Sequence, residues 1–184
     1  MPFFSPDGQW IGFYAKGKLN KVAVKSGVPS PICDDAGAVG FCWGSDGRII
    51  FGREGSGLGY VPAAGGRPET LTTLDAGKEA THRLPHLLPG GKALMFTVMP
   101  AQFGVEARIE WLSFETGKRK ALMEDGADAR YVSTGHLIFV RRGALMAAPF
   151  NLDRLETTGP AVTVKTGLMQ AFNSSMPGLN SGAG

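Results

Sequence analysis

The sequence is poor in cysteine and in charge. Its 184 residues include two cysteines, and charged residues make up 19% of the chain. Two thiols are too few for a disulfide-rich scaffold. Cys33 and Cys42 are also too far apart for a CxxC motif, and no other ligand type clusters around them. We predict two buried thiols; the alternative, a disulfide between neighbouring strands, would need an oxidising compartment.

The sequence also lacks signals for membranes and export. No apolar stretch reaches the roughly 18 residues of a membrane span, and the start has neither the basic nor the apolar region of a signal peptide. We therefore expect a cytoplasmic protein that binds no membrane, although a longer parent protein could be periplasmic or membrane-tethered. The net charge is +3 from scattered basic residues, which favours solvated turns over nucleic-acid binding.

Motifs for several enzyme classes are missing as well. The chain contains no GxSxG, SxxK, HExxH or phosphate-binding P-loop pattern. No cluster of metal-ligating residues stands out, so we expect neither a metal nor another cofactor. The sequence therefore presents no complete catalytic constellation.

Glycine and proline are abundant by contrast, with 27 and 12 residues, which indicates many turns and many short strands. Four segments share a polar turn that ends in glycine and leads into a short apolar strand with a phenylalanine. The turns end at Gly8, Gly47, Gly91 and Gly135, and the spacings are 39, 44 and 44 residues. This period is typical of four-stranded propeller blades.

Each repeat continues as strand, turn, strand, loop, strand, turn, strand, and no segment has the capped 3.6-residue period of a helix. The sequence therefore predicts an all-β fold of four four-stranded antiparallel blades of a β-propeller. The apolar runs 49–51 and 137–139 are predicted to be inner strands that are covered on both faces. The predicted blades are residues 1–37, 38–80, 81–127 and 128–172, followed by a flexible tail at 173–184.

The turn motif is clearest in the segment 4–13, Phe-Ser-Pro-Asp-Gly-Gln-Trp-Ile-Gly-Phe. At these residues the chain resembles the TolB-like, WD40-like (PD40) β-propeller repeats of bacteria. The segments 82–91 and 130–141 are similar to blades of propellers that follow bacterial serine/threonine kinase domains. The resemblance covers residues 2–170 and implies the fold much more specifically than a function.

The resemblance also raises the question of completeness. Propellers of this family usually have six or seven blades, and four are visible here, so the chain looks like part of a longer protein. If the four blades do not close into a small ring, the first and last blades expose apolar faces and strand edges. We therefore expect a homo-oligomer that covers these ends.

Candidate site residues come from the turns and from the three histidines. His136 and Arg141 are predicted to line the ligand channel. Weak catalytic candidates are the serines and histidines that could meet across blades, namely Ser5, Ser45, Ser133, His82, His86 and His136. The spacing of His82 and His86 would suit a metal on a helix, but Pro85 and the following strand argue for structural hydrogen bonds instead.

Other conspicuous side chains are predicted to be structural. Asp7 and Asp46 occupy matching turns, which favours turn formation over a pair of catalytic carboxylates. Trp10, Trp43 and Trp111 are interpreted as aromatics that pack between blades, with a stacking platform for a ligand as the alternative.

Two functional classes remain open at this point. The resemblance to kinase-linked sensor propellers favours a non-catalytic module that binds a protein partner or a small ligand. The alternative is an esterase-like hydrolase with a serine nucleophile, and a third possibility is a fragment without activity of its own.

Overall fold

A computed structural model describes residues 2–34 and 38–168, and the predicted tail at 173–184 lies outside these residues. The described chain is all-β and contains no helix, so none is present that could cross a membrane. Every strand pairing is antiparallel, and the strands form four separate sheets in chain order. The architecture is that of consecutive β-propeller blades, as the repeat predicts.

Each blade is a meander in which consecutive strands are neighbours. Blade 1 contains β1 (Phe3–Phe4), β2 (Trp10–Ala15), β3 (Lys18–Ala23) and β4 (Pro29–Asp34), and blade 2 contains β5 (Ala38–Trp43), β6 (Arg48–Arg53), β7 (Gly59–Pro62) and β8 (Glu69–Thr70). Blade 3 contains β9 (Glu79–Leu87), β10 (Ala93–Pro100), β11 (Arg108–Ser113) and β12 (Arg119–Met123). Blade 4 contains β13 (Ala127–Val132), β14 (His136–Arg141), β15 (Ala144–Asn151), β16 (Glu156–Thr157) and β17 (Val162–Lys165).

The fourth position of blade 4 is shared by two strands. β16 pairs with residues 150–151 of β15, and β17 pairs with residues 145–147 of the same strand. The last blade therefore keeps the common four-position plan, with its outermost strand divided in two.

The predicted turns join the first and second strands of each blade. Gly8, Gly47, Gly91 and Gly135 have φ values of 68°, 78°, 66° and 81°, a conformation that glycine adopts without the steric cost of a Cβ. In blades 1 and 2 the aspartate before the glycine accepts a hydrogen bond from the backbone N–H two residues on, at 3.0 Å in both turns. The side chains of Asp7 and Asp46 thus stabilise turns, as the repetition indicates.

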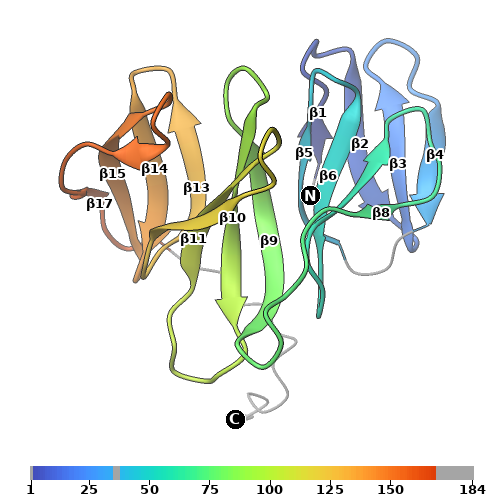
Figure 1. Ribbon diagram of the computed structural model, residues 1–184. Helices are drawn as coiled ribbons and strands as arrows, with labels where there is room; N and C mark the ends of the chain where they lie inside the picture. Colours follow the sequence, from blue (N-terminus) through green and yellow to red (C-terminus); the bar gives the residue numbers. More distant parts are fainter. Residues whose placement is uncertain (1, 35–37, 169–184) are drawn as a thin grey trace, which may run out of the picture.

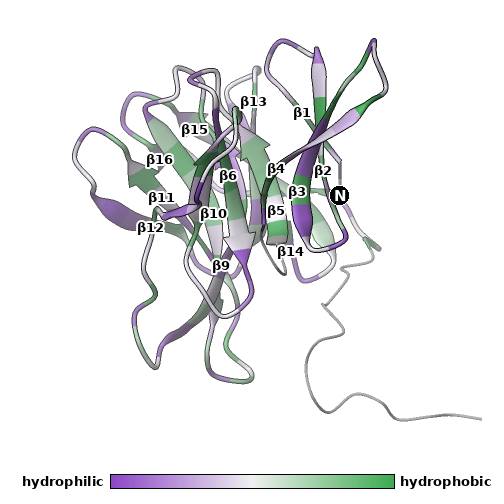
Figure 2. Cartoon of the chain, turned by 90° about the vertical axis from the view of Figure 1, so that its right-hand side faces the viewer, coloured by the Kyte–Doolittle hydropathy of each residue, from purple (hydrophilic) through white to green (hydrophobic). Residues whose placement is uncertain are grey.

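Hydrophobic residues gather in three clusters, one at each contact between neighbouring blades. Alternation along the second strand explains this, because successive side chains point to opposite faces. Phe51 packs towards blade 1, Ile50 and Phe96 pack between blades 2 and 3, and Met95 and Phe139 pack between blades 3 and 4. Figure 2 shows the resulting contrast between an apolar strand such as β15 and the hydrophilic outer strand β12.

The first strands, rather than the second ones, lie innermost. β9 contacts β5 on one side and β13 on the other, whereas the second strands lie one position farther from this line of contact. The sequence prediction that 49–51 and 137–139 are inner strands is therefore wrong, since these residues belong to β6 and β14. They are apolar because a blade packs on each face of β6, and because blade 3 covers one face of β14.

The four blades form an open arc and not a closed ring. Blade 4 and blade 1 lie at opposite ends of the fan in Figure 1, and blades 2 and 3 lie between them. Interdigitating apolar side chains join blade 1 to 2, 2 to 3 and 3 to 4. One face of blade 1 and one face of blade 4 consequently belong to none of these three interfaces.

Candidate axial pocket

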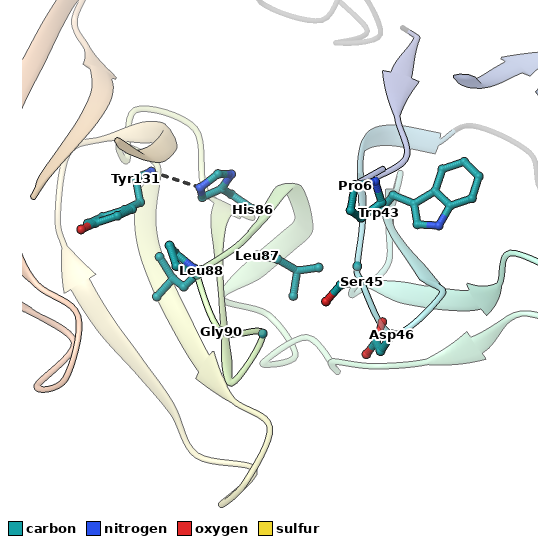
Figure 3. Close-up of a pocket in the computed structure, with 12 residues that line it drawn as sticks. Pro6, Trp43, Ser45, Asp46, His86, Leu87, Leu88, Gly90 and Tyr131 are labelled. Atoms are coloured by element: carbon teal, nitrogen blue, oxygen red, sulfur yellow. Dashed lines mark hydrogen bonds between the residues drawn. The ribbon is translucent and has the colours of Figure 1, made fainter. Parts of the chain in front are cut away.

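The turns at one end of the four first strands surround a pocket of about 420 Å³. All four blades contribute to its lining: Pro6 comes from blade 1, Trp43 and residues 44–46 from blade 2, residues 86–91 from blade 3, and Tyr131 from blade 4. Figure 3 shows these side chains arranged around a common opening. Because the first strands converge on the axis of the arc, this pocket lies where a ligand would contact every blade.

Three large side chains that line the pocket occupy equivalent positions of the repeat. Trp43, Leu87 and Tyr131 each precede the turn glycine of their blade by four residues. Trp43 also packs against the cluster between blades 1 and 2, and Tyr131 packs against the cluster between blades 3 and 4. Their rings are therefore held by the core while they line the pocket. The packing role predicted for Trp43 is confirmed, whereas a stacking platform for a ligand stays a prediction.

His86 is the titratable ring of this pocket. Its Nε2 accepts a hydrogen bond of 3.1 Å from the Tyr131 backbone N–H, shown dashed in Figure 3. The neutral ring must then carry its proton on Nδ1, which makes no hydrogen bond to any described residue. Burial, together with the nearby charge of Arg130, lowers the pKa of His86 to about 4. The ring therefore remains a neutral hydrogen-bond donor at neutral pH.

A backbone bulge separates the two neighbouring histidines. Leu84 has a φ of 53°, and the register between β9 and β10 shifts at this point. His82 lies opposite Val98 and His86 lies opposite Met95, and these two partners face blades 2 and 4 respectively. Residues four apart on a regular strand share a face, so the bulge is what turns the two imidazole rings to opposite sides.

The same bulge recurs in blades 2 and 4. Gly40 and Asp128 stand at the equivalent position, seven residues before the turn glycine, with φ values of 94° and 53°. The pairings of β5 with β6 and of β13 with β14 are irregular at the same place. Asp128 is fixed there, since its N–H donates to Thr97 and its carboxylate contacts Arg130 at 2.6 Å. The bulge is thus a repeated feature that determines to which side the side chains of these first strands point.

Asp46, the acid at the rim of the pocket, forms an ion pair with Arg48. Burial would raise the pKa of Asp46, but hydrogen bonds from the Arg48 backbone and guanidinium, together with the Arg48 charge, hold it below its usual value. The Arg48 guanidinium lies 2.6 Å from the carboxylate. The pocket therefore offers a neutral histidine and a neutralised acid rather than a free charge.

The structure pairs none of the candidate serines with a histidine. Ser5 is buried and its hydroxyl donates to Asp7, whereas Ser45 lines the axial pocket. Ser133 is exposed in the β13–β14 turn, and His136 is exposed at the start of β14, where its Nδ1 lies 3.0 Å from the Thr134 carbonyl. Within residues 2–34 and 38–168, no hydrogen bond joins these serines to His82, His86 or His136.

The two residues predicted to line the channel lie on β14, one strand away from the axis, and the axial pocket does not include them. Arg141 donates from Nε to the Asp125 carbonyl at 2.7 Å and from Nη2 to the Glu124 carbonyl at 3.3 Å. It therefore ties β14 to the loop between blades 3 and 4. The prediction took β14 for the innermost strand, whereas β14 is the second strand of its blade.

Sequence reasoning missed a second polar site, which is a buried network between blades 2 and 3. His82 Nε2–H donates to the Glu79 carboxylate at 3.0 Å, so Nδ1 of the neutral ring carries no proton. The Thr72 hydroxyl donates to this Nδ1 at 2.7 Å and accepts a hydrogen bond from the Leu58 N–H at 2.8 Å. The order hydroxyl, imidazole, carboxylate resembles a catalytic relay, but all three side chains are buried.

Two arginines complete this network. Arg108 and Arg119 both bind Glu79 and both bind Glu110. Burial acts to raise the pKa of Glu79, but hydrogen bonds from Asp75 N–H and His82 and the charge of Arg119 hold it below its usual value. Burial lowers the pKa of His82. A neutral histidine between a hydroxyl and an ion-paired carboxylate fastens the loop that links blades 2 and 3.

The two cysteines form no disulfide. Cys33 is buried and Cys42 is half-buried, so the structure agrees with the thiol interpretation and not with the disulfide alternative, and burial raises the pKa of Cys42 to about 12. Among the described residues, no three His, Cys, Asp or Glu side chains come together in an arrangement that could hold a metal ion.

Comparison with known proteins supports the fold. No family model and no curated protein matches the sequence. Among solved structures, TolB from Acinetobacter baumannii superposes with a TM-score of 0.70 and 18% identity over 91% of this chain and 43% of its own. An auxiliary nutrient binding protein from Bacteroides thetaiotaomicron gives 0.69 with 9% identity, over 92% of this chain and 42% of its own.

An oligogalacturonate lyase from Vibrio parahaemolyticus gives a TM-score of 0.63 with 12% identity, over 90% of this chain and 53% of its own. At these identities the likeness establishes the β-propeller fold, including its TolB-like form, and nothing finer. The chain spans about half the length of these three structures. The expected link to a kinase domain stays a prediction.

Proposed function

We propose that this chain is a non-catalytic binding module that takes a protein segment or a small ligand into the axial pocket. The observation that carries the proposal is the convergence of side chains from all four blades on one opening that contains the neutral donor His86. A ligand seated there would bridge blades that otherwise meet only pairwise. The nutrient binding protein among the solved structures is a precedent for binding on this fold.

The pocket chemistry favours an uncharged ligand. His86 is neutral, and the Asp46 carboxylate is occupied by Arg48, so a charged group would lose hydration without gaining a free counter-charge. Trp43 and Tyr131 provide aromatic surface, and His86 Nδ1–H provides one hydrogen bond. A neutral ligand with a planar or apolar face and one acceptor fits these groups best.

The proposal is tested by thermal-shift screening with uncharged saccharides, nucleosides and short neutral peptides, followed by tryptophan fluorescence titration of any compound that raises Tm. We expect His86→Ala and Trp43→Ala to weaken binding at least tenfold, and the bound compound to be recovered chemically unchanged. The matched control is Phe103→Ala, because Phe103 is 92% exposed on the β10–β11 loop. Binding that survives both pocket substitutions would place the ligand elsewhere.

A further inference from the structure

The phenylalanine of the repeat has the same environment in three blades and a different one in the fourth. Phe51, Phe96 and Phe139 are at most 2% exposed, and each packs against the preceding blade. Phe13 is the equivalent residue of blade 1, but it is only half-buried and belongs to none of the three hydrophobic clusters. No blade among the described residues precedes blade 1, so the face that carries Phe13 has no partner sheet.

An apolar row crosses this face of blade 1. The register aligns Phe4 with Ile11, Ile11 with Val22, and Val22 with Pro29. Directly paired residues of antiparallel strands share a face, and Phe13 shares it because it lies two positions from Ile11. Phe4 is 65% exposed. We call the surface formed by Phe4, Ile11, Phe13, Val22 and Pro29 the blade-1 end face.

A matching surface lies at the other end of the arc, on blade 4. The register aligns Ile138 with Ala147, and Ala147 with Val162, while Val140 lies opposite Leu145. The intervening residues Leu137 and Phe139 are buried against blade 3, so this row points the other way. Val162 is 58% exposed. The surface formed by Ile138, Val140, Leu145, Ala147 and Val162 is the blade-4 end face.

These two faces are the two halves of the interface that the chain already uses three times. At each internal contact, the phenylalanine-bearing face of one blade packs on the opposite face of the blade before it. Within the described part of the chain, no blade packs on the blade-1 end face, which is a phenylalanine-bearing face. Nor does any described blade pack on the blade-4 end face, which is an opposite face. A second copy of this chain offers each missing half in the same relative orientation.

We propose that copies of this chain associate end to end, with the blade-1 end face of one copy packed on the blade-4 end face of the next. If the rotation between copies closes after two, the product is a ring in which both faces of both copies are covered. If the rotation does not close, longer open assemblies form. In both cases the contact continues the internal stacking of blades across a boundary between chains.

The test is sedimentation velocity of the full chain over a range of protein concentrations. We expect wild-type protein to sediment at twice the 19.4 kDa chain mass or more. Phe13→Glu and Ile138→Glu should each give the chain mass alone, because each destroys one half of every contact. Phe103→Glu, which charges an exposed ring on a loop outside both faces, should keep the wild-type mass.

Mixing the two variants separates loss of an interface from loss of folding. The Phe13→Glu chain keeps an intact blade-4 end face and the Ile138→Glu chain keeps an intact blade-1 end face, so an equimolar mixture should form a dimer and stop there. Wild-type protein that remains a monomer at every concentration would overturn the proposal. So would self-association that survives both single substitutions, or a mixture of folded variants that stays monomeric at concentrations where wild type associates.

Discussion

The interior blades and the end blades have the same sequence pattern but different environments. In blade 3, the adjacent residues Leu94 and Met95 of β10 are both completely buried, since blades 2 and 4 cover the two faces of that strand. In blade 4, Leu137 is buried whereas its neighbour Ile138 is only half-buried. Stability in this architecture therefore depends on neighbouring blades more than on the sheet that carries a residue.

The largest losses of stability should occur where neighbouring blades cover both faces of a strand. We expect Leu94→Ala and Met95→Ala each to cost about 2–5 kcal/mol of unfolding free energy, the usual cost of truncating a buried side chain. Leu137→Ala should cost a similar amount, but Ile138→Ala only about 1 kcal/mol. Urea unfolding at low protein concentration measures all four, and equal losses for Leu137 and Ile138 would contradict the open arc.

The next effect concerns the polar contact between blades 2 and 3. Glu79→Ala should cost about 2–4 kcal/mol, because it leaves two arginines and His82 without their shared carboxylate. Glu79→Gln keeps hydrogen-bonding oxygen at that position and should lose less, which separates charge from hydrogen bonding. A loss below about 0.5 kcal/mol for Glu79→Ala would show that the network does not fasten the blades.

The axial pocket should make stability depend on pH. An unfolded histidine takes up its proton near 6.5, whereas His86 in the folded protein takes it up only near 4, so the unfolded state binds more protons between these values. The contribution of neutral His86 to the free energy of unfolding is fully present above pH 6.5. It is lost as the pH falls towards 4, by about 1–2 kcal/mol at pH 5. His86→Gln should flatten this part of the stability profile in urea unfolding, and an unchanged slope would show that His86 does not titrate in this way.

The smallest effect should come from the turns. Gly47 has a φ of 78° and open space around its Cα, so Gly47→Ala adds no clash and costs only backbone strain, about 1 kcal/mol. Gly57→Ala is the contrasting variant, because a Cβ there would lie 1.8 Å from the Thr72 carbonyl oxygen. Thermal unfolding should show a much larger decrease of Tm for Gly57→Ala, and a reversed order would contradict these local geometries.

The repeat itself could be predicted because its signal is local. Each turn glycine stands one or two residues before the first residue of its strand, and the period of the four glycines sets the number of blades without any long-range information. The same reasoning anticipated exposed apolar faces on the end blades. It placed the axis one strand too far along, however, because it took the apolar runs 49–51 and 137–139, which belong to β6 and β14, for the innermost strands.

The sites could not be predicted because their signals are not local. His86 faces the pocket because of the bulge at Leu84. A positive φ can be expected at a glycine such as Gly40 in blade 2, but it cannot be predicted for a leucine. The network around Glu79 combines a threonine before β9 with arginines from β11 and β12. No spacing along the chain marks such a set, since only the folded sheets bring its members together.

The stability of the four equivalent phenylalanine variants tests the central claim most directly. Phe13→Ala, Phe51→Ala, Phe96→Ala and Phe139→Ala should be compared by urea unfolding at a concentration where the chain is monomeric. The open arc predicts losses of about 3–5 kcal/mol at the three internal positions and less than about 1.5 kcal/mol at Phe13. Four equal losses would mean that blade 1 is covered like the others and that the arc is not open.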